Sequence, residues 1–155
     1  MVELINVAPA NDPAIKRGVI IMLIQSIAVK DYMNTSLVMF APEMDVMSAI
    51  LVLVKNRISA APVLNERGDL VGVLSEKDCM NIAINAGYHE EYGGQVKDYM
   101  SKQVVCVEAD DTVIDVANMF LNTERRRFPV LEDNRLVGVI SRRDVLRALV
   151  DINKR

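Results

Sequence analysis

Residues 72–78 have the sequence GVLSEKD, and residues 138–144 repeat the pattern as GVISRRD. Each copy follows a short apolar run and precedes a segment of helical period, so each predicts a strand, a tight turn and a helix. The glycine permits close approach of a backbone or a ligand, and the serine can cap the new helix. The chain therefore uses one structural unit twice.

The serine and the aspartate of this motif admit two interpretations. A serine followed three residues later by an acid is a capping box, which satisfies the free backbone donors at a helix start. The same helix start is also an anion site, because its N–H groups and the helix dipole favour a phosphate. A carboxylate beside it can accept hydrogen bonds from two ribose hydroxyls. The motif alone leaves capping and ligand binding open.

The repeated unit is longer than the motif and covers most of the chain. Both copies open with VKDYM, at 29–33 and at 96–100, and the remaining segments recur in the same order. The pattern predicts strand, helix, strand, strand and helix in each copy. The predicted strands include 37–40, 61–64, 104–107 and 128–131, and the last helices are 75–86 and 141–152. One unit cannot cover its own sheet, so we expect the two to pack as a pseudo-twofold pair.

The first 28 residues stand outside the repeat and predict a helical extension. The sequence Asn11-Asp12-Pro13 offers a cap followed by proline at the first helical position, so we expect a helix over 13–29. This helix is apolar on nearly every side, which predicts burial against its own domain or, alternatively, against a second copy or another protein. The predicted domains are the extension (1–28), a first repeat (29–86), a linker (87–95) and a second repeat (96–155).

The composition is that of a globular protein with a substantial core. Of 155 residues, 51% are hydrophobic and 25% are charged, with a net charge of -3. This balance argues against a polybasic nucleic-acid binder and a disordered acidic chain. The N-terminus lacks the features of a signal peptide and the apolar run at 18–28 is too short for a bilayer, so we expect a cytoplasmic protein that does not enter membranes.

The reactive side chains predict no catalysis. His89 is the single histidine, so neither a His-based triad nor a His-based metal site can be assembled. Cys79 and Cys106 lack metal-ligand or CxxC spacing, and we expect free thiols in a reducing compartment. The sequence therefore predicts a protein that is not an enzyme and carries neither a metal nor a cofactor.

These features together resemble the CBS domain. The matching motifs are Val-x-Asp-x-Met at each opening, hydrophobic-Pro-Val at 61–63 and 128–130, and Gly-hydrophobic-x-Ser-x-x-Asp at each repeated turn. They cover about residues 29–150, and their duplication resembles a stand-alone tandem pair, or Bateman module. The resemblance implies an α/β fold of two βαββα repeats. It also implies an adenosine-containing ligand such as AMP, ADP, ATP or S-adenosylmethionine between the repeats, and a homodimer.

The resemblance also implies roles for site residues in both copies. Asp78 and Asp144 match the residue that binds ribose, and Ser75 and Ser141 match the hydroxyl that contacts ribose or phosphate. Adenine needs a flat apolar slot. Each residue that is a candidate for this slot could instead be an ordinary core residue. The candidates are Ile58, Pro62, Phe128, Pro129, Val38 and Val105.

The residues that reach phosphates in that family differ between the copies. The second copy has Arg125-Arg126-Arg127-Phe128 before the strand proline, whereas the first has Ser59-Ala60-Ala61, which carries no charge. Arg142 and Arg143 stand where the first copy has Glu-Lys. Arginine's planar fork suits phosphate oxygens, so we expect unequal clefts. Pseudo-twofold packing would also let these arginines serve a nucleotide whose ribose binds Asp78. A solvated charge run at a helix end is the alternative reading of Arg125–Arg127.

The predicted function is regulatory. An adenine nucleotide is expected to bind between the repeats and to alter the contacts with an unidentified partner protein. The alternatives are a ligand-free scaffold for dimerisation or interaction and a module that binds S-adenosylmethionine. Nucleic-acid binding through the arginines is disfavoured because the remainder of the chain is negatively charged.

Overall fold

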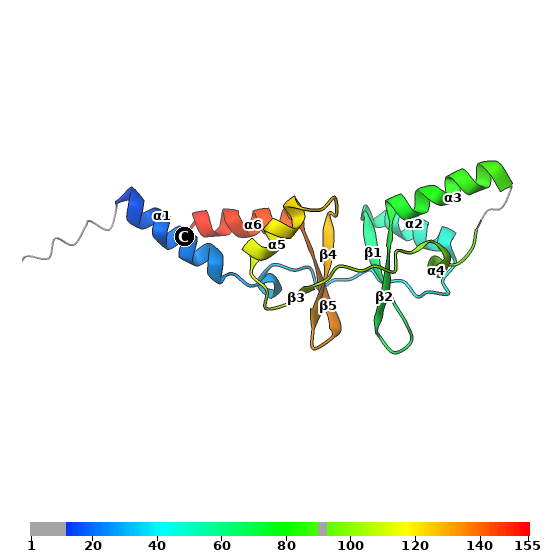
Figure 1. The fold of residues 1–155 in the computed structure, drawn as a ribbon, viewed down its shortest axis with the longest axis horizontal. Helices are drawn as coiled ribbons and strands as arrows, with labels where there is room; N and C mark the ends of the chain where they lie inside the picture. Colours follow the sequence, from blue (N-terminus) through cyan, green and yellow to red (C-terminus); the bar gives the residue numbers. More distant parts are fainter. Residues whose placement is uncertain (1–11, 90–92) are drawn as a thin grey trace, which may run out of the picture.

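The computed structural model describes residues 12–89 and 93–155, so the first part of the predicted extension and the middle of the predicted linker lie outside the described residues. The molecule is elongated, with two bodies side by side (Figure 1). The elements are α1 (Pro13–Ser26), a 3-10 turn (Val29–Asp31), α2 (Val46–Asn56), β1 (Ala60–Leu64), β2 (Leu70–Ser75), α3 (Glu76–His89), α4 (Val96–Tyr99), β3 (Val107–Glu108), α5 (Val113–Leu121), β4 (Arg127–Glu132), β5 (Arg135–Ser141) and α6 (Arg142–Asn153).

Each body is built on an antiparallel hairpin of the same register. β1 pairs with β2 so that Pro62 lies opposite Val73, and β4 pairs with β5 so that Pro129 lies opposite Val139. β3 adds a parallel strand to β4. The two hairpins stand side by side at the centre, with α2 and α3 toward one end of the molecule and α5, α6 and α1 toward the other (Figure 1). The predicted α/β pair of repeats with an N-terminal helix is confirmed.

The opening segment of each repeat packs on the opposite body. Val29 is fully buried in the core of the second body, and its N–H donates to the carbonyl of Asp111 at 2.8 Å. Val96 is fully buried in the core of the first body, and its N–H donates to the carbonyl of Met44 at 2.9 Å. Each core therefore includes a segment from the other repeat, and the pair is interlocked.

The predicted strands after these openings are reduced to short pairings. Within the segment predicted at 37–40, only Phe40 pairs, by a single parallel bridge to Val63, and the segment predicted at 104–107 contributes only the start of β3. The reason is the crossing, because Asn34 still pairs with Val139 of the second body. The residues between Asn34 and Phe40 pass from one body to the other and form only these isolated bridges at their two ends.

The two repeated glycines lie where the crossing segments touch the strands. A Cβ on Gly72 would lie 2.6 Å from the sulfur of Met100 and 3.0 Å from the carbonyl oxygen of Ser101. A Cβ on Gly138 would lie 2.5 Å from the sulfur of Met33. The glycines are therefore required for close approach of a neighbouring segment.

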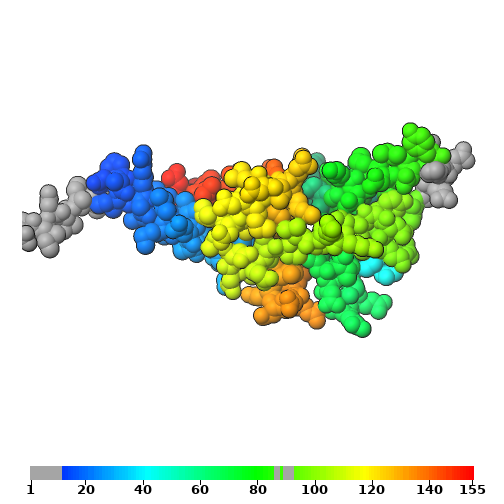
Figure 2. Space-filling model, in the orientation of Figure 1, coloured from blue at the N-terminus to red at the C-terminus, as the bar shows by residue number. Residues whose placement is uncertain are grey.

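The N-terminal helix is shorter and more exposed than its sequence predicts. α1 ends at Ser26, and Val29 belongs instead to the 3-10 turn. The helix packs against α5 and α6, but none of its residues is buried, and Met22 is 71% exposed. It forms one end of the molecule (Figure 2), and the expected packing on its own domain is present, but it does not bury any residue of the helix completely. In the part of the chain that the structure describes, no helix is long and apolar enough to cross a membrane.

Candidate functional site

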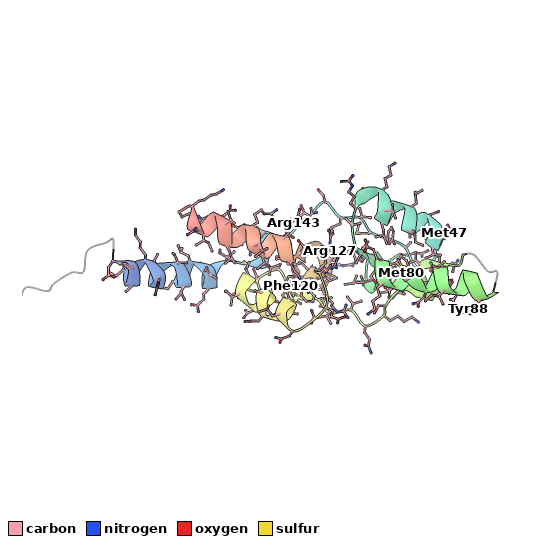
Figure 3. All side chains as sticks on the ribbon, turned by 90° about the horizontal axis from the view of Figure 1, so that it is seen from above. Met47, Met80, Tyr88, Phe120, Arg127 and Arg143 are labelled. Atoms are coloured by element: carbon pink, nitrogen blue, oxygen red, sulfur yellow. The ribbon has the colours of Figure 1, made fainter. Side chains whose placement is uncertain are left out.

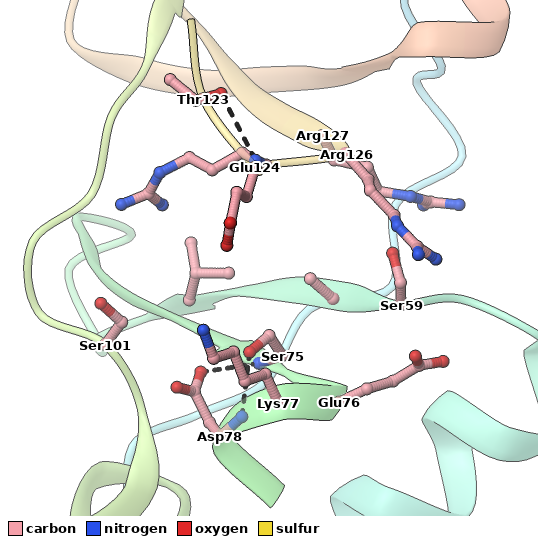
Figure 4. Close-up of a pocket in the computed structure, with 13 residues that line it drawn as sticks. Ser59, Ser75, Glu76, Lys77, Asp78, Ser101, Thr123, Glu124, Arg126 and Arg127 are labelled. Carbon is pink, nitrogen blue, oxygen red and sulfur yellow. Dashed lines mark hydrogen bonds between the residues drawn. The ribbon is translucent and has the colours of Figure 1, made fainter. Parts of the chain in front are cut away.

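A cavity of about 700 Å³ lies between the two repeats. This volume is within the usual range for small-molecule sites. The first repeat and the segment that follows it form one wall, and the loop between α5 and β4 forms the opposite wall (Figure 4). The lining residues are Ser59, Ala60, Val73, Ser75, Glu76, Lys77, Asp78, Ser101, Thr123, Glu124, Arg125, Arg126 and Arg127.

The turn from β2 into α3 places Asp78 on the floor of this cavity. The N–H of Ser75 donates to Oδ2 of Asp78 at 2.9 Å, and the N–H of Asp78 donates to Oγ of Ser75 at 3.1 Å. The motif therefore does cap the helix. Among the described residues, Oδ1 of Asp78 has no hydrogen-bond partner and Asp78 forms no ion pair. Capping leaves one carboxylate oxygen of this half-buried side chain free for a ligand.

The opposite wall carries the arginines of the second repeat. Arg125 is held by its Nη2, which donates to the carbonyl of Gln103 at 3.2 Å. Arg126 and Arg127 line the cavity and extend to the side above Ser59, and neither forms an ion pair within residues 12–89 and 93–155 (Figure 4). The wall therefore offers two guanidinium groups without a carboxylate partner to an anionic ligand.

The corresponding corner of the second repeat is closed. The N–H and the hydroxyl of Ser141 both donate to Oδ2 of Asp144 at 2.8 Å. Oδ1 of Asp144 lies 3.2 Å from Nη2 of Arg147, and Asp144 is only 9% exposed. Both oxygens of this carboxylate are engaged by the chain itself, and Asp144 does not line the cavity.

The arginines that follow Ser141 also lie away from the cavity. Nη2 of Arg142 donates to the carbonyl of Thr123 at 3.3 Å, and its guanidinium lies 6.0 Å from the ring centre of Phe120. Arg142 therefore braces the loop that carries Arg125–Arg127. Arg143 is exposed on α6, farther from the junction of the bodies than Arg127 (Figure 3).

The structure does not bring the six apolar candidates to this cavity. Phe128 is fully buried and stacks on Phe120 with ring centres 4.5 Å apart. Ile58 and Val38 pack against the core of the first body, and Val105 is 38% exposed. Pro62 and Pro129 line a small cavity beside the main one, and the two cavities share Ala60, Val73, Arg125 and Arg127. The apolar surface of the main cavity comes from Ala60 and Val73, which are small residues.

Several residues that line the cavity were not predicted from the sequence. Ser101 and Thr123 line the cavity, although neither belongs to a motif. Ser101 follows the repeated VKDYM directly, and this position is the one signal that could have found it. Lys77 and Glu76 belong to the repeated turn and add one positive and one negative charge beside Asp78.

The cysteines are free thiols of low acidity. Burial, with Asp78 and Glu76 nearby, raises the pKa of Cys79 to about 11, and burial also raises the pKa of Cys106. Among the described residues, no group of three or more His, Cys, Asp or Glu side chains is placed to hold a metal ion.

Comparison with known proteins identifies the family of this chain. The model of the CBS domain matches it twice, at residues 29–85 and 96–151. The uncharacterized protein MJ1426 of Methanocaldococcus jannaschii is 28% identical over 153 residues, which cover 79% of this chain and 90% of that protein.

Two solved structures have the same fold. CBSX2 of Arabidopsis thaliana, solved in complex with AMP, has a TM-score of 0.73 and 30% identity, covering 83% of this chain and 99% of that one. The CBS domain pair of protein MJ0100, in complex with 5-methylthioadenosine and S-adenosyl-L-methionine, has a TM-score of 0.66 and 25% identity, covering 83% and 98%. The present chain therefore belongs to the CBS domain family, as a tandem pair of CBS domains that forms a Bateman module.

Proposed function

We propose that this chain is a regulatory module that binds an adenine nucleotide in the cavity between its repeats. The ribose binds Asp78 and Ser75, and the phosphates bind Arg126 and Arg127. The observation that carries this proposal is that one cavity of about 700 Å³ has, on opposite sides, an Asp78 oxygen without a hydrogen-bond partner and two arginines without an ion pair, all judged within the part of the chain that the structure describes. The AMP complex of CBSX2, at 30% identity, supports the choice of ligand.

The charges of the cavity favour a phosphate ligand over S-adenosylmethionine. Four positively charged side chains, Lys77 and Arg125–Arg127, and three negatively charged ones, Glu76, Asp78 and Glu124, line it, and three of the four positive charges lie on one wall. Arginine binds phosphate oxygens through paired N–H groups, whereas it repels a sulfonium cation. S-adenosylmethionine remains the alternative ligand because MJ0100 binds it.

The cavity also suggests how binding is transmitted. Its two walls belong to different repeats, so a ligand that contacts both favours one arrangement of the two bodies over others. We propose that this change is read by a separate partner protein, and that the module acts by binding without catalysing a reaction. Free Cys79 and Cys106 suit a reducing compartment, and we propose a cytoplasmic location.

A homodimer is the proposed assembly. α2 and α3 expose a set of large apolar side chains at one end of the molecule, where Met47, Met80 and Tyr88 project outward (Figure 3). Exposed apolar surface of this kind marks interaction sites. Light scattering of the purified chain checks the proposal, and a monomeric mass at every concentration would contradict it.

Isothermal titration of ligand-free protein with AMP, ADP, ATP and S-adenosylmethionine tests the proposed ligand. We expect saturable binding of at least one nucleotide. Asp78→Asn keeps an acceptor for the N–H of Ser75, so it preserves the cap while it weakens ribose binding. The pair Arg126→Ala and Arg127→Ala should weaken nucleotides by about tenfold or more.

Arg143→Ala is the matched control for these titrations, because it removes an exposed arginine that does not line the cavity. We expect it to bind nucleotides as the wild type does. Absence of binding heat with all four compounds, from folded and ligand-free protein, would exclude the proposed function.

A further inference from the structure

We infer that Arg147 occupies the ribose position of the second repeat, so that each chain binds one nucleotide, at Asp78. This inference rests on the proposed function. The two corners have the same backbone arrangement, since the serine N–H lies 2.9 Å from Oδ2 of Asp78 and 2.8 Å from Oδ2 of Asp144. What separates them is the partner of the remaining carboxylate oxygen.

In the second repeat this partner is Arg147, which three groups hold in place. Its Nη2 lies 3.2 Å from Oδ1 of Asp144 and donates to the carbonyl of Tyr32 at 2.8 Å. Its guanidinium lies over the Tyr32 ring, 5.8 Å from the ring centre. The side chain of Arg147 is 54% exposed, so its orientation depends on these three contacts, an ion pair, a hydrogen bond and a cation–π contact, rather than on burial.

The first repeat lacks this arginine although it keeps the surroundings. Asn81 stands three residues after Asp78, where Arg147 stands three residues after Asp144, and Tyr99 is the counterpart of Tyr32. The hydroxyl of Tyr99 donates instead to the carbonyl of Gly93 at 2.8 Å. One side chain therefore decides whether the aspartate is open or closed.

The position of Arg147 corresponds to ligand space in the first repeat. Tyr32 is followed at two residues by Asn34, whose counterpart Ser101 lines the cavity next to Asp78. Arg147 thus joins Asp144 to the segment that contains Tyr32. The counterpart of this segment, which contains Ser101, lines the cavity beside Asp78. A ribose hydroxyl would have to displace the guanidinium and replace an ion pair, on a carboxylate that is 9% exposed, with a neutral hydrogen bond. The second corner therefore keeps its own cation.

Moving the arginine between the repeats tests this inference. Asn81→Arg should place a guanidinium next to Asp78 on α3 and weaken binding of AMP and ATP about tenfold or more, because α3 has the same helical spacing as α6. Ala83→Arg adds the same charge to an exposed position of α3 that does not face Asp78, and it should bind as the wild type does. Asp144→Asn should also leave nucleotide affinity unchanged.

The stoichiometry gives the second readout, from titration calorimetry with AMP and ATP. We expect one nucleotide per wild-type chain and, because Asn removes the occupant, a second and weaker site in Arg147→Asn. A double-mutant cycle of Asp144→Asn and Arg147→Asn in urea unfolding without nucleotide should be non-additive, which confirms the bond itself.

The outcomes that would overturn the role of Arg147 differ from those that would overturn the proposed function. Two nucleotides per wild-type chain, unchanged binding by Asn81→Arg, or an additive cycle would overturn the role of Arg147 while nucleotide binding stands. A wild type that binds none of AMP, ADP and ATP would instead overturn the proposed function, and the inference would fall with it.

Discussion

The two helix starts at Ser75–Asp78 and Ser141–Asp144 have the same backbone hydrogen bonds, but only the first aspartate is accessible to a ligand. Asp78 keeps a free oxygen in a cavity whose far wall is arginine-rich, whereas Asp144 is 9% exposed and bonded to Arg147. The hairpin register that supports them is the same. Duplication therefore preserved the frame, and a few side chains decided which copy is open to a ligand.

The difference is distributed between the repeats in a reciprocal way. The open corner belongs to the first repeat, but the arginines that face it belong to the second. Those arginines are in turn braced by Arg142, from the turn that carries Asp144. The second repeat thus supplies side chains to a site on the first repeat, while its own Asp144 makes only contacts within the chain.

The cores of the two bodies also differ in their side chains, and this difference gives the largest predicted effect on stability. The second body has a stacked aromatic pair where the first has smaller residues. Phe120 and Phe128 stack at 4.5 Å, and their counterparts in the first body are Leu53 and Ala61, both also buried. Phe128→Ala would copy the first-body residue into a core that is shaped for an aromatic ring. We expect a loss of about 3–5 kcal/mol in the free energy of unfolding, because a large cavity is left behind. Urea unfolding measures it.

Val105→Ala is the control for this prediction, since Val105 was the more exposed of the apolar candidates and is 38% exposed. It should change the free energy of unfolding by less than about 1 kcal/mol. A comparable loss in both variants would contradict the distinction between a core residue and a surface residue.

The repeated glycines give the next largest effect. Gly72→Ala forces a Cβ to within 3.0 Å of the carbonyl oxygen of Ser101, which is backbone and cannot move alone. We expect a cost of about 1–3 kcal/mol in unfolding free energy, typical of an overpacked contact. Because Ser101 lines the cavity, nucleotide binding should weaken as well. Urea unfolding and titration calorimetry measure the two effects.

Gly138→Ala separates the two effects of this substitution. Its Cβ would press on Met33 and approach the carbonyl oxygen of Asn34 to 3.2 Å, at the closed corner. We expect a smaller destabilisation and unchanged nucleotide affinity. Equal weakening of nucleotide binding by both variants would show that the glycine contacts do not distinguish the corners.

Most of the fold was predictable because the repeat fixes it. The hairpins, the capped helices and the pseudo-twofold pairing all follow from periodicity and from the duplicated motif. The crossing of the opening segments was not predictable, because Val29 and Val96 look like core residues of their own repeats. The shortened strands and the exposed α1 follow from this tertiary arrangement, which periodicity alone does not contain.

The candidate site was predictable in its parts and not in its assembly. Sequence patterns selected Asp78, Ser75 and the arginines, and the possibility that arginines of one repeat serve the other was already implied by the symmetry. The ion pair that blocks Asp144 depends on Arg147. This residue lies in no motif, so nothing in the sequence distinguishes it from an ordinary arginine on the surface of a helix. Of the predicted apolar slot, Phe128 is buried in the core, which depends on packing between distant segments, while Pro62 and Pro129 line the small cavity beside the main one.

The smallest predicted effect concerns the residue that follows each aspartate. Cys79 is buried in the first body, and its counterpart in the second is the buried Val145. Cys79→Val makes the two positions alike and should change the free energy of unfolding at pH 7 by less than about 1.5 kcal/mol, because the two side chains are similar in volume. The informative difference between the side chains is expected in alkali.

The pKa of Cys79 is raised from 9.0 to about 11 in the folded protein, chiefly by burial. An unfolded thiol ionises near pH 9, so between pH 9 and pH 11 the unfolded state binds fewer protons than the folded state, and stability falls as pH rises. Valine has no proton to lose. The urea midpoint of the wild type should therefore fall relative to that of Cys79→Val between pH 9 and pH 11. Val145→Cys should introduce the same fall in stability through the second repeat. Midpoints of wild type and Cys79→Val that stay parallel across this interval would mean that the thiol ionises as readily in the folded chain as in the unfolded one.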